Sequence, residues 1–231
     1  MGLAAVVPCL GLPDRVEAVL SALPSSVAAY VVDDGSDPPL APSRGVLLRH
    51  ERTLGYGAAQ RTGYARALAD GADPVVLVHG DAQYEVEDVL ALAEALRDAD
   101  AALGSRFLGE DPPDVPPWRS LGVRALTAAA GLRFGIRASD LHNGARAFRA
   151  ATLRGLPLDR FPDGYLFDHA VIAALLARGA RIVQRPVRMT YGPHVRSIPP
   201  LAALRYGLGC LGHLVRPPGG GRRGIVAKTS R

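Results

Sequence analysis

Residues 74–84 have the sequence Pro-Val-Val-Leu-Val-His-Gly-Asp-Ala-Gln-Tyr and join a short apolar run to a polar turn. The run at 75–78 is rich in β-branched residues, which is typical of a strand buried on both faces of a parallel sheet. Ligands of open α/β sheets bind just beyond the carboxyl ends of such strands. Alternate side chains of an extended turn point the same way, so His79, Asp81 and Gln83 are predicted to converge on a metal or a phosphate. The alternative interpretation is a polar loop and a helix that begins near Asp81.

The chain has 231 residues, of which 48% are hydrophobic and 21% are charged, as in an ordinary globular protein with a sizeable core. No apolar run approaches the ~20 residues that cross a bilayer. The first residues lack the basic start of a signal peptide, and the only two cysteines, Cys9 and Cys210, offer neither a disulfide framework nor a thiolate metal site. From these features we expect a cytoplasmic protein.

The net charge of +5 conceals a strong asymmetry between the two halves of the chain. Residues 1–115 hold 18 acidic and 8 basic side chains, whereas residues 116–231 hold 4 acidic and 19 basic ones. We therefore expect the basic half to meet an anion: a phosphate-bearing substrate, an anionic membrane surface or nucleic acid. Nucleic acid is not the expected partner, because the sequence has no interleaved basic and aromatic motif.

Apolar patterns divide the chain into alternating strands and helices. Apolar runs predict strands at 3–7, 27–32, 45–49, 75–78, 101–103 and 181–187, with a short strand within 140–149. Helical spacing predicts helices at 14–23, after 59 to about 70, and at 85–98, 118–134, 165–178 and 201–215, the first of them capped by Asp14. This order predicts an α/β fold with a Rossmann-like, mostly parallel mixed sheet and helices on both faces.

Polar loops and tails carry further candidates. Asp33, Asp34 and Ser36 follow the second predicted strand. Gly55 and Gly57 open the next helix, where free backbone N–H groups can meet an anion. The acidic, proline-rich segment 108–117 indicates a linker or a lid, and residues 217–231 predict a disordered basic tail.

Five short motifs follow one another in a recognisable order: Val-Val-Asp-Asp-Gly-Ser at 31–36, Leu-Gly-Tyr-Gly-Ala-Ala at 54–59, His-Gly-Asp-Ala-Gln-Tyr at 79–84, Gly-Ser-Arg at 104–106, and residues 140–149. Together they resemble glycosyltransferase family 2 of the dolichol-phosphate mannose synthase type, which has the GT-A fold. The resemblance covers roughly residues 3–198. We therefore expect a GT-A domain at 1–198, an amphipathic helix at 199–216 and a tail at 217–231.

The resemblance implies metal-dependent, inverting transfer of a hexose from a GDP- or UDP-sugar. The residues that match the family's donor site are Pro8, Asp33, Asp34, Ser36, Gly55, Gly57 and Asp81. Asp81 and Gln83 match its metal-binding turn, which suits Mg²⁺ or Mn²⁺ because these hard ions favour oxygen ligands. His79 stands where the family has the first acid of that turn, either as a third ligand or as a hydrogen-bonding residue. Catalytic roles fall on Asp81, Arg106 and Asp168.

The acceptor implied by the resemblance is a polyprenyl phosphate, with a small-molecule or saccharide hydroxyl as the second candidate. The predicted acceptor and phosphate contacts are Arg124, Asp140, Gly144, Arg146 and Arg196. A lipid phosphate is already anionic, whereas a hydroxyl needs a carboxylate such as Asp168 as its base. The apolar stripe of the last helix predicts either peripheral contact with the anionic inner face of a membrane or packing on the domain.

Two departures from the family leave alternatives open. Gly11 and Leu12 replace the Asn-Glu signature that follows the first strand, so the donor base stays open. This loss, together with His79, allows a second hypothesis: a degenerate nucleotide-sugar-binding or scaffold protein without turnover. A sugar nucleotidyltransferase is disfavoured because residues 8–14 contain no lysine.

Overall fold

The structure is a computed structural model that describes residues 2–109, 117–190 and 200–218. Most of the predicted linker at 108–117 and nearly all of the predicted tail at 217–231 lie outside these ranges. Arg196, one of the predicted phosphate contacts, also lies outside the described residues.

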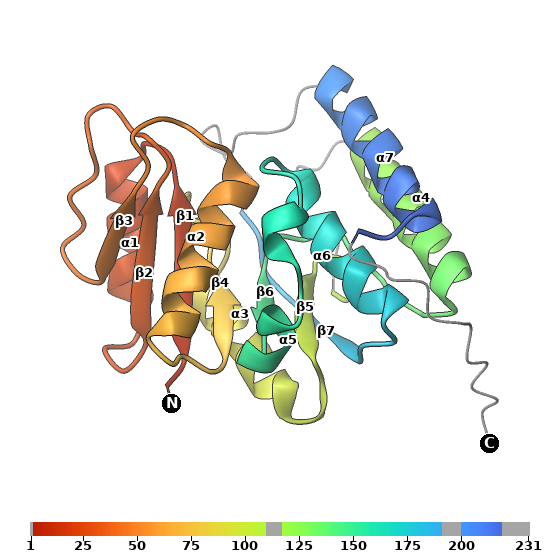
Figure 1. The fold of residues 1–231 in the computed structure, drawn as a ribbon, viewed down its shortest axis with the longest axis horizontal. Coiled ribbons are helices and arrows are strands. Elements are labelled where there is room, and N and C mark those ends of the chain that lie inside the picture. The colour runs from red at the N-terminus through yellow and green to blue at the C-terminus, as the bar shows by residue number, and fades with distance from the viewer. Residues whose placement is uncertain (1, 110–116, 191–199, 219–231) are drawn as a thin grey trace.

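A seven-stranded sheet forms the centre of the described part, in the order β3-β2-β1-β4-β6-β5-β7 (Figure 1). The strands are β1 (Ala4–Cys9), β2 (Ala28–Asp33), β3 (Val46–Arg49), β4 (Val75–Leu77), β5 (Ala101–Ser105), β6 (Arg146–Phe148) and β7 (Ile182–Pro186). Within this sheet only β6 runs antiparallel, between β4 and β5. The predicted mixed, mostly parallel sheet is confirmed.

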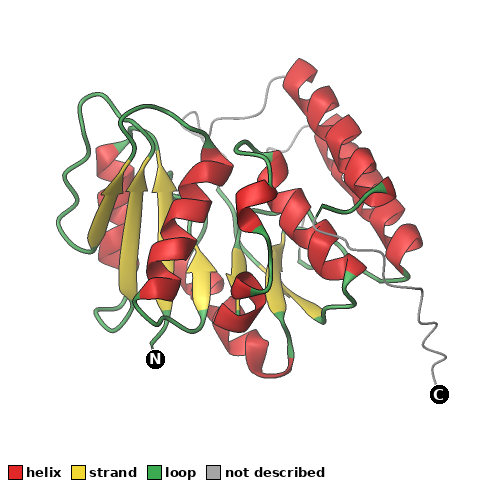
Figure 2. Ribbon diagram, viewed as in Figure 1, coloured by secondary structure: helices red, strands yellow, loops and turns green. Residues whose placement is uncertain are grey.

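Helices cover both faces of the sheet (Figure 2). They are α1 (Pro13–Ala22), α2 (Tyr56–Ala69), α3 (Val86–Glu94), α4 (Pro117–Phe134), α5 (Ala150–Arg154), α6 (Leu166–Ala177) and α7 (Pro200–Val215), with short 3₁₀ turns at η1 (Ala95–Asp98) and η2 (Leu158–Arg160). Successive side chains of a strand point to opposite faces of the sheet. Because helices cover both faces, β1 is buried along its whole length. Val6 packs into the core that includes α2 and α6, while Ala5 and Val7 pack into the core under α1 and α3.

Two local predictions differ from the structure. Asp14 does not cap α1, because the helix begins one residue earlier at Pro13, after Leu12 in a left-handed conformation with φ of 60°. Proline is suited to this first position since its missing N–H has no helical partner to lose. The short helix α5 was not predicted, because five residues are too few to show a helical periodicity.

The helices α4 and α7 lie side by side at one end of the sheet (Figure 1). One face of α7 packs on α6 and α4 and buries Cys210 and Leu214. The opposite face carries the apolar stripe that the sequence predicted, and its members Leu204, Leu208, Leu211 and Val215 are exposed. Among the helices of the described ranges, none has both the length and the apolar character needed to span a membrane.

Candidate functional site

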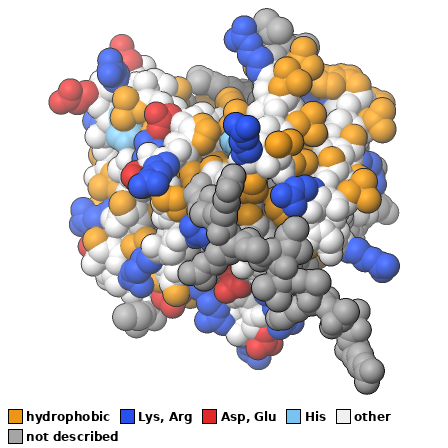
Figure 3. All heavy atoms as spheres, turned by 45° about the vertical axis from the view of Figure 1, so that its right-hand side comes forward, with side chains coloured by type: hydrophobic (Ala, Val, Ile, Leu, Met, Phe, Trp, Pro, Cys, Tyr) orange, Lys and Arg blue, Asp and Glu red, His pale blue; other side chains and the backbone are white. Residues whose placement is uncertain are grey.

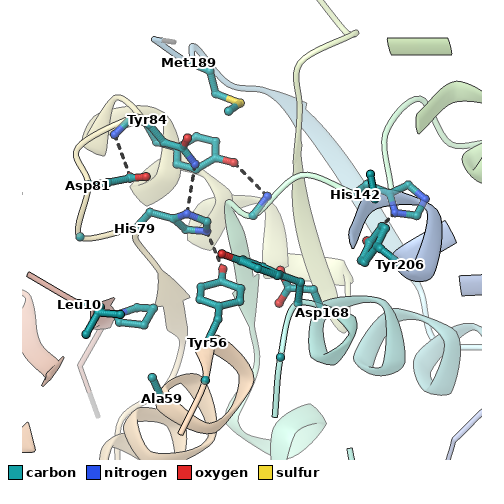
Figure 4. A pocket seen from close by; sticks show the side chains of 18 of the residues that line it. Leu10, Tyr56, Ala59, His79, Asp81, Tyr84, His142, Asp168, Met189 and Tyr206 are labelled. Carbon is teal, nitrogen blue, oxygen red and sulfur yellow. Dashed lines mark hydrogen bonds between the residues drawn. The ribbon is translucent and has the colours of Figure 1, made fainter. Parts of the chain in front are cut away.

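A cavity of about 830 Å³ opens at the carboxyl ends of the central strands (Figure 4). Loops that follow β1, β2, β4 and β5 form one side of it, and α4 and α7 contribute the other. Nine of the predicted site residues line it: Pro8, Asp34, Gly55, His79, Asp81, Gln83, Arg106, Gly144 and Asp168. The ligand-binding position predicted from the strand ends therefore coincides with the cavity.

The turn after β4 is tightened by its own aspartate. Oδ1 of Asp81 accepts a hydrogen bond from the backbone N–H of Gln83 at 3.2 Å, across Ala82, whose φ is 55°. A positive φ is uncommon outside glycine and marks a turn that its surroundings hold in place. The turn thus presents the Asp81 carboxylate to the cavity in a fixed place.

The imidazole of His79 is bound at both of its ring nitrogens (Figure 4). Nε2 lies 2.6 Å from the Tyr56 hydroxyl, and Nδ1 lies 3.1 Å from Nε2 of Gln83. Burial lowers the pKa of His79, although the negative charge of Asp81 opposes this effect. A neutral ring with both nitrogens engaged fits the hydrogen-bonding role proposed for His79 rather than the role of a metal ligand.

The turn after β4 offers few side chains that could coordinate a metal ion. Within the described ranges, no group of three His, Cys, Asp or Glu side chains is placed to hold a metal ion. Asp81 and Gln83 together offer hard oxygen atoms from two residues. That set suits Mg²⁺ or Mn²⁺ when phosphate oxygens and waters complete the coordination. The residues present therefore fit a substrate-bridged divalent ion.

The glycine turn before α2 is held by Asp34. Its carboxylate accepts hydrogen bonds from the backbone N–H groups of Leu54 and Gly55, both at 2.9 Å, and contacts His50 at 2.6 Å. The carbonyl oxygen of Asp163 accepts the N–H groups of the next residues, Gly57 and Ala58. The expectation of free N–H groups at this helix start is therefore wrong for these positions.

The two glycines are needed for close packing against the chain before α6. A Cβ on Gly55 would lie 2.6 Å from the Asp163 carbonyl oxygen, and one on Gly57 would lie 2.4 Å from Cβ of Phe167. Gly55 also has a φ of 119°, which side-chain-bearing residues rarely adopt. The glycine motif thus allows α2 and the α6 segment to meet at the edge of the cavity.

Asp33 and Ser36 lie behind the cavity and organise its loops. Asp33 is fully buried and accepts the N–H groups of Ser36 and Leu40, while Arg49 pairs with it at 2.7 Å. Burial alone raises the pKa of Asp33, but these hydrogen bonds and the Arg49 charge more than offset it and lower the pKa. The Ser36 hydroxyl accepts the N–H of Gly11 at 2.7 Å and so connects the loops after β1 and β2.

Asp168 reaches the cavity from the first turn of α6, and both of its carboxylate oxygens have partners. Oδ1 accepts a hydrogen bond from Gln60 at 2.8 Å, and Oδ2 lies 3.5 Å from the guanidinium of Arg146. Arg146 is 1% exposed and does not line the cavity. Its Nη1 also donates to the Asp168 carbonyl oxygen at 2.9 Å, so this arginine holds the start of α6 against β6.

Arg106 lines the cavity and is oriented by the predicted acceptor motif. Its Nε donates to Asp140 at 2.7 Å, and its Nη2 donates to the carbonyl oxygen of His142 at 3.0 Å. Asp140 is fully buried and does not reach the cavity. Arg124 lies outside the lining too, with its guanidinium 4.2 Å from the centre of the Phe107 ring.

Several lining residues were missed by the sequence reasoning, among them Tyr56, Tyr84, Trp118, Arg119, His142, Tyr165 and Tyr206. Most are aromatic, and an aromatic residue in a sequence is indistinguishable from core filler without its neighbours. Tyr56 had one usable signal, because it stands between the two glycines of a motif that was already assigned to the site.

Three histidines from distant segments stack beside the cavity. The His169 ring is stacked between the rings of His142 and His213, at centroid distances of 5.5 and 5.4 Å. Burial lowers the pKa of His142 to about 3 and that of His169 to about 2. His142 also lies 2.8 Å from the Tyr206 hydroxyl. These contacts join α7 to α6 and to the loop before β6.

The sequence of the chain is similar to that of known proteins. Residues 10–156 match the family model described as glycosyl transferase family 2. The undecaprenyl-phosphate mannosyltransferase of Micrococcus luteus is 31% identical over 187 residues, which is 76% of each chain.

Solved structures of glucosyl-3-phosphoglycerate synthase from Mycobacterium tuberculosis are similar in fold. A complex with Mn²⁺, UDP and glucosyl-3-phosphoglycerate has a TM-score of 0.65 at 18% identity, and a complex with phosphoglyceric acid has a TM-score of 0.67 at 16% identity. Each match covers 95% of this chain and 82% of the other. The predicted GT-A fold is confirmed.

Proposed function

The chain belongs to glycosyltransferase family 2, and from this premise we propose that it transfers a hexose from a nucleotide-diphosphate sugar to a polyprenyl phosphate. The family match and the glycosyltransferase relatives support an enzyme over a degenerate nucleotide-sugar-binding or scaffold protein. The name of the Micrococcus luteus relative supports mannose as the first sugar to test and an undecaprenyl phosphate as the first acceptor. The donor base, guanine or uracil, is left to experiment.

The two candidate acceptors make different demands on Asp168. A hydroxyl acceptor needs a general base, and Asp168 in the cavity lining keeps lone pairs for that role beyond its contacts with Gln60 and Arg146. A phosphate acceptor carries its negative charge before it enters the cavity and needs no such base. The choice of the lipid phosphate therefore rests on the name of the Micrococcus luteus relative and on the exposed apolar residues beside the cavity.

In the proposed reaction, an oxygen of the acceptor phosphate attacks the anomeric carbon of the donor sugar. The bond from that carbon to the diphosphate oxygen breaks, and the diphosphate leaves with the electron pair. Such a single displacement inverts the anomeric configuration. Asp81 and Gln83 would hold Mg²⁺ or Mn²⁺, which supplies positive charge for the leaving diphosphate. Arg106, held by Asp140, supplies a permanent cation to the cavity wall.

The exposed apolar face of α4 and α7 supports contact with a membrane. Trp118 and Leu204 line the cavity and are nevertheless 52% and 61% exposed, so the apolar surface continues from the cavity to the outside. Figure 3 shows hydrophobic side chains gathered over this end, with Lys and Arg side chains among them. We propose that this face lies on an anionic membrane at its cytoplasmic side and brings the lipid acceptor to the cavity.

The test is a transfer assay with the full chain, Mn²⁺ or Mg²⁺, and labelled GDP- and UDP-hexoses, GDP-mannose first. One set of anionic vesicles contains undecaprenyl phosphate, and the matched control set contains undecaprenol, which differs only in lacking the phosphate. We expect labelled lipid in the first set alone. Transfer to undecaprenol, or to a soluble saccharide without transfer to undecaprenyl phosphate, would show that the acceptor assignment is wrong.

A further inference from the structure

The hydrogen bonds of His79 form a chain with a defined direction. The amide nitrogen of Gln83 can only donate, so the Nδ1 atom of His79 that faces it at 3.1 Å must accept. A neutral imidazole then carries its proton on Nε2, and this N–H faces the Tyr56 hydroxyl oxygen at 2.6 Å, while the Gly144 backbone is a further hydrogen-bond partner of the ring. The proton of the Tyr56 hydroxyl is thereby turned away from His79.

The imidazole is fixed in this orientation by its packing. The rings of Tyr56 and Tyr84 contact it edge-on, at centroid distances of 5.3 and 5.0 Å. Gly144 leaves the space that the ring occupies, because a Cβ there would lie 2.1 Å from Nε2 of His79. The packing of the ring therefore fixes the direction of the hydrogen bonds from Gln83 through His79 to Tyr56.

The Tyr56 hydroxyl lies where it can donate a hydrogen bond to a bound substrate. Tyr56, His79 and Gln83 line the same cavity as Asp81, and Figure 4 shows Tyr56 approaching the imidazole from α2 while Asp81 lies on the turn after β4. Within the described ranges the Tyr56 hydroxyl has His79 as its hydrogen-bond partner. Its own O–H remains available to an oxygen of a ligand.

We propose that Tyr56 binds the donor by donating its O–H to an oxygen of the diphosphate, and that His79 is the positioning residue that sets the direction of this hydroxyl. The inference rests on the proposed function, since it presumes a nucleoside diphosphate beside Asp81. It also explains the chemistry of position 79. A carboxylate can only accept, so an aspartate there would attract the Tyr56 proton and turn it away from the substrate.

The experiment measures nucleotide binding, which does not depend on the acceptor. Isothermal titration calorimetry with UDP and with GDP, each with saturating Mn²⁺, is carried out on the full chain and on four variants: Tyr56→Phe, His79→Gln, His79→Asp and the double variant Tyr56→Phe with His79→Asp. Electron paramagnetic resonance of Mn²⁺ without nucleotide reports metal affinity separately. The matched control is Tyr30→Phe, which removes a hydroxyl bonded to Asp70 at 3.0 Å, outside the cavity. Thermal melting verifies that every variant is folded.

We expect Tyr56→Phe to weaken binding of the preferred nucleotide about tenfold, the loss of one hydrogen bond to a charged acceptor. His79→Gln keeps an N–H donor near Nε2 and should weaken binding less than threefold. His79→Asp should weaken it about tenfold, with no further loss when Tyr56→Phe is added. Mn²⁺ affinity without nucleotide should stay unchanged in Tyr56→Phe and His79→Gln, and Tyr30→Phe should bind both nucleotides as the natural protein does.

Two results would overturn the inference alone: unchanged nucleotide binding in Tyr56→Phe, or tighter Mn²⁺ and nucleotide binding in His79→Asp, which would identify position 79 as a ligand position. If the natural protein bound neither UDP nor GDP in the presence of Mn²⁺, the donor site itself would be wrong, and the proposed function would fail with the inference.

Discussion

The loop side and the helix side of the cavity are held together by different means. On the loop side, carboxylates accept backbone N–H groups: Asp33 from Ser36, Asp34 from Gly55, and Asp81 from Gln83. On the helix side, α7 packs on α4 and α6, with stacked rings between α6 and α7, and it leaves a row of leucines exposed. The loop side is thus held by its own hydrogen bonds, whereas the helix side presents a surface that suits an apolar partner.

Asp81→Ala tests the loop side where the largest effect is expected. Loss of the carboxylate that would hold the divalent ion should reduce kcat/KM for transfer about 1000-fold or more, equivalent to about 4 kcal/mol of transition-state stabilisation. The melting temperature should change little, because the residue makes one backbone hydrogen bond. The control is Glu87→Ala, an exposed change on α3. Turnover that persisted in Asp81→Ala would remove the metal assignment.

Arg146→Met tests the junction between the two sides. It leaves the Asp168 carboxylate without its buried cation, and breaking such a pair costs about 3–5 kcal/mol of the free energy of unfolding. Urea denaturation measures this loss, with the exposed Arg15→Met on α1 as the control at about 0.5 kcal/mol or less. The double variant Arg146→Met with Asp168→Leu should recover most of the stability. A single variant as stable as the natural protein would show that the pair does not hold α6.

Acid should weaken the helix side through its stacked histidines. The folded-state pKa values of His142 and His169, about 3 and about 2, lie below the ordinary value of 6.5. The unfolded chain therefore binds more protons between these values, so stability is complete above pH 6.5 and is lost as the pH falls below it. Each histidine lowers the free energy of unfolding by up to about 1.4 kcal/mol for each pH unit below 6.5.

Denaturation between pH 7 and pH 5 measures this slope. His169→Phe keeps a ring in the stack but removes one proton site, so its slope should be smaller by the contribution of one histidine. Equal slopes for the variant and the natural protein would show that the stack does not exclude protons.

Leu208→Ser should have the smallest effect, confined to the exposed apolar face of α7. Leu208 is 61% exposed on α7, so its loss should leave the fold and UDP or GDP binding unchanged. Flotation with anionic vesicles should show about tenfold weaker binding, since burial of one leucine contributes about 1.5–3 kcal/mol and insertion is partial. Leu47→Ser, an exposed change on β3, is the control. Unchanged flotation of Leu208→Ser would argue against membrane contact through this face.

The sheet and the location of the site could be predicted because they depend on local patterns. Apolar runs such as 75–78 mark strands, and the polar turn that follows a buried strand marks its carboxyl end. The different roles of neighbouring residues in one loop could not be predicted. Asp33 and Asp34 are neighbours, yet Asp33 faces the interior beside Arg49 while Asp34 lines the cavity.

Contacts between distant segments were equally hidden. Tyr56 and His79 are 23 positions apart, and Gln60 meets Asp168 across 108 positions. Such pairs form only when the helices pack on the sheet, so no local sequence pattern predicts them. The free N–H groups expected at Gly57 were taken up by Asp163 for the same reason.

The space left by Gly144 has a consequence for anyone who re-engineers the site. Because the imidazole at position 79 fills the room where a Cβ at 144 would be, the two positions form one volume shared by two chain segments. A shorter residue at 79 opens a void that an alanine at 144 can fill, whereas alanine at 144 alone collides with the ring. A larger residue at 144 therefore needs a smaller one at 79, whereas a change at 79 alone needs no change at 144.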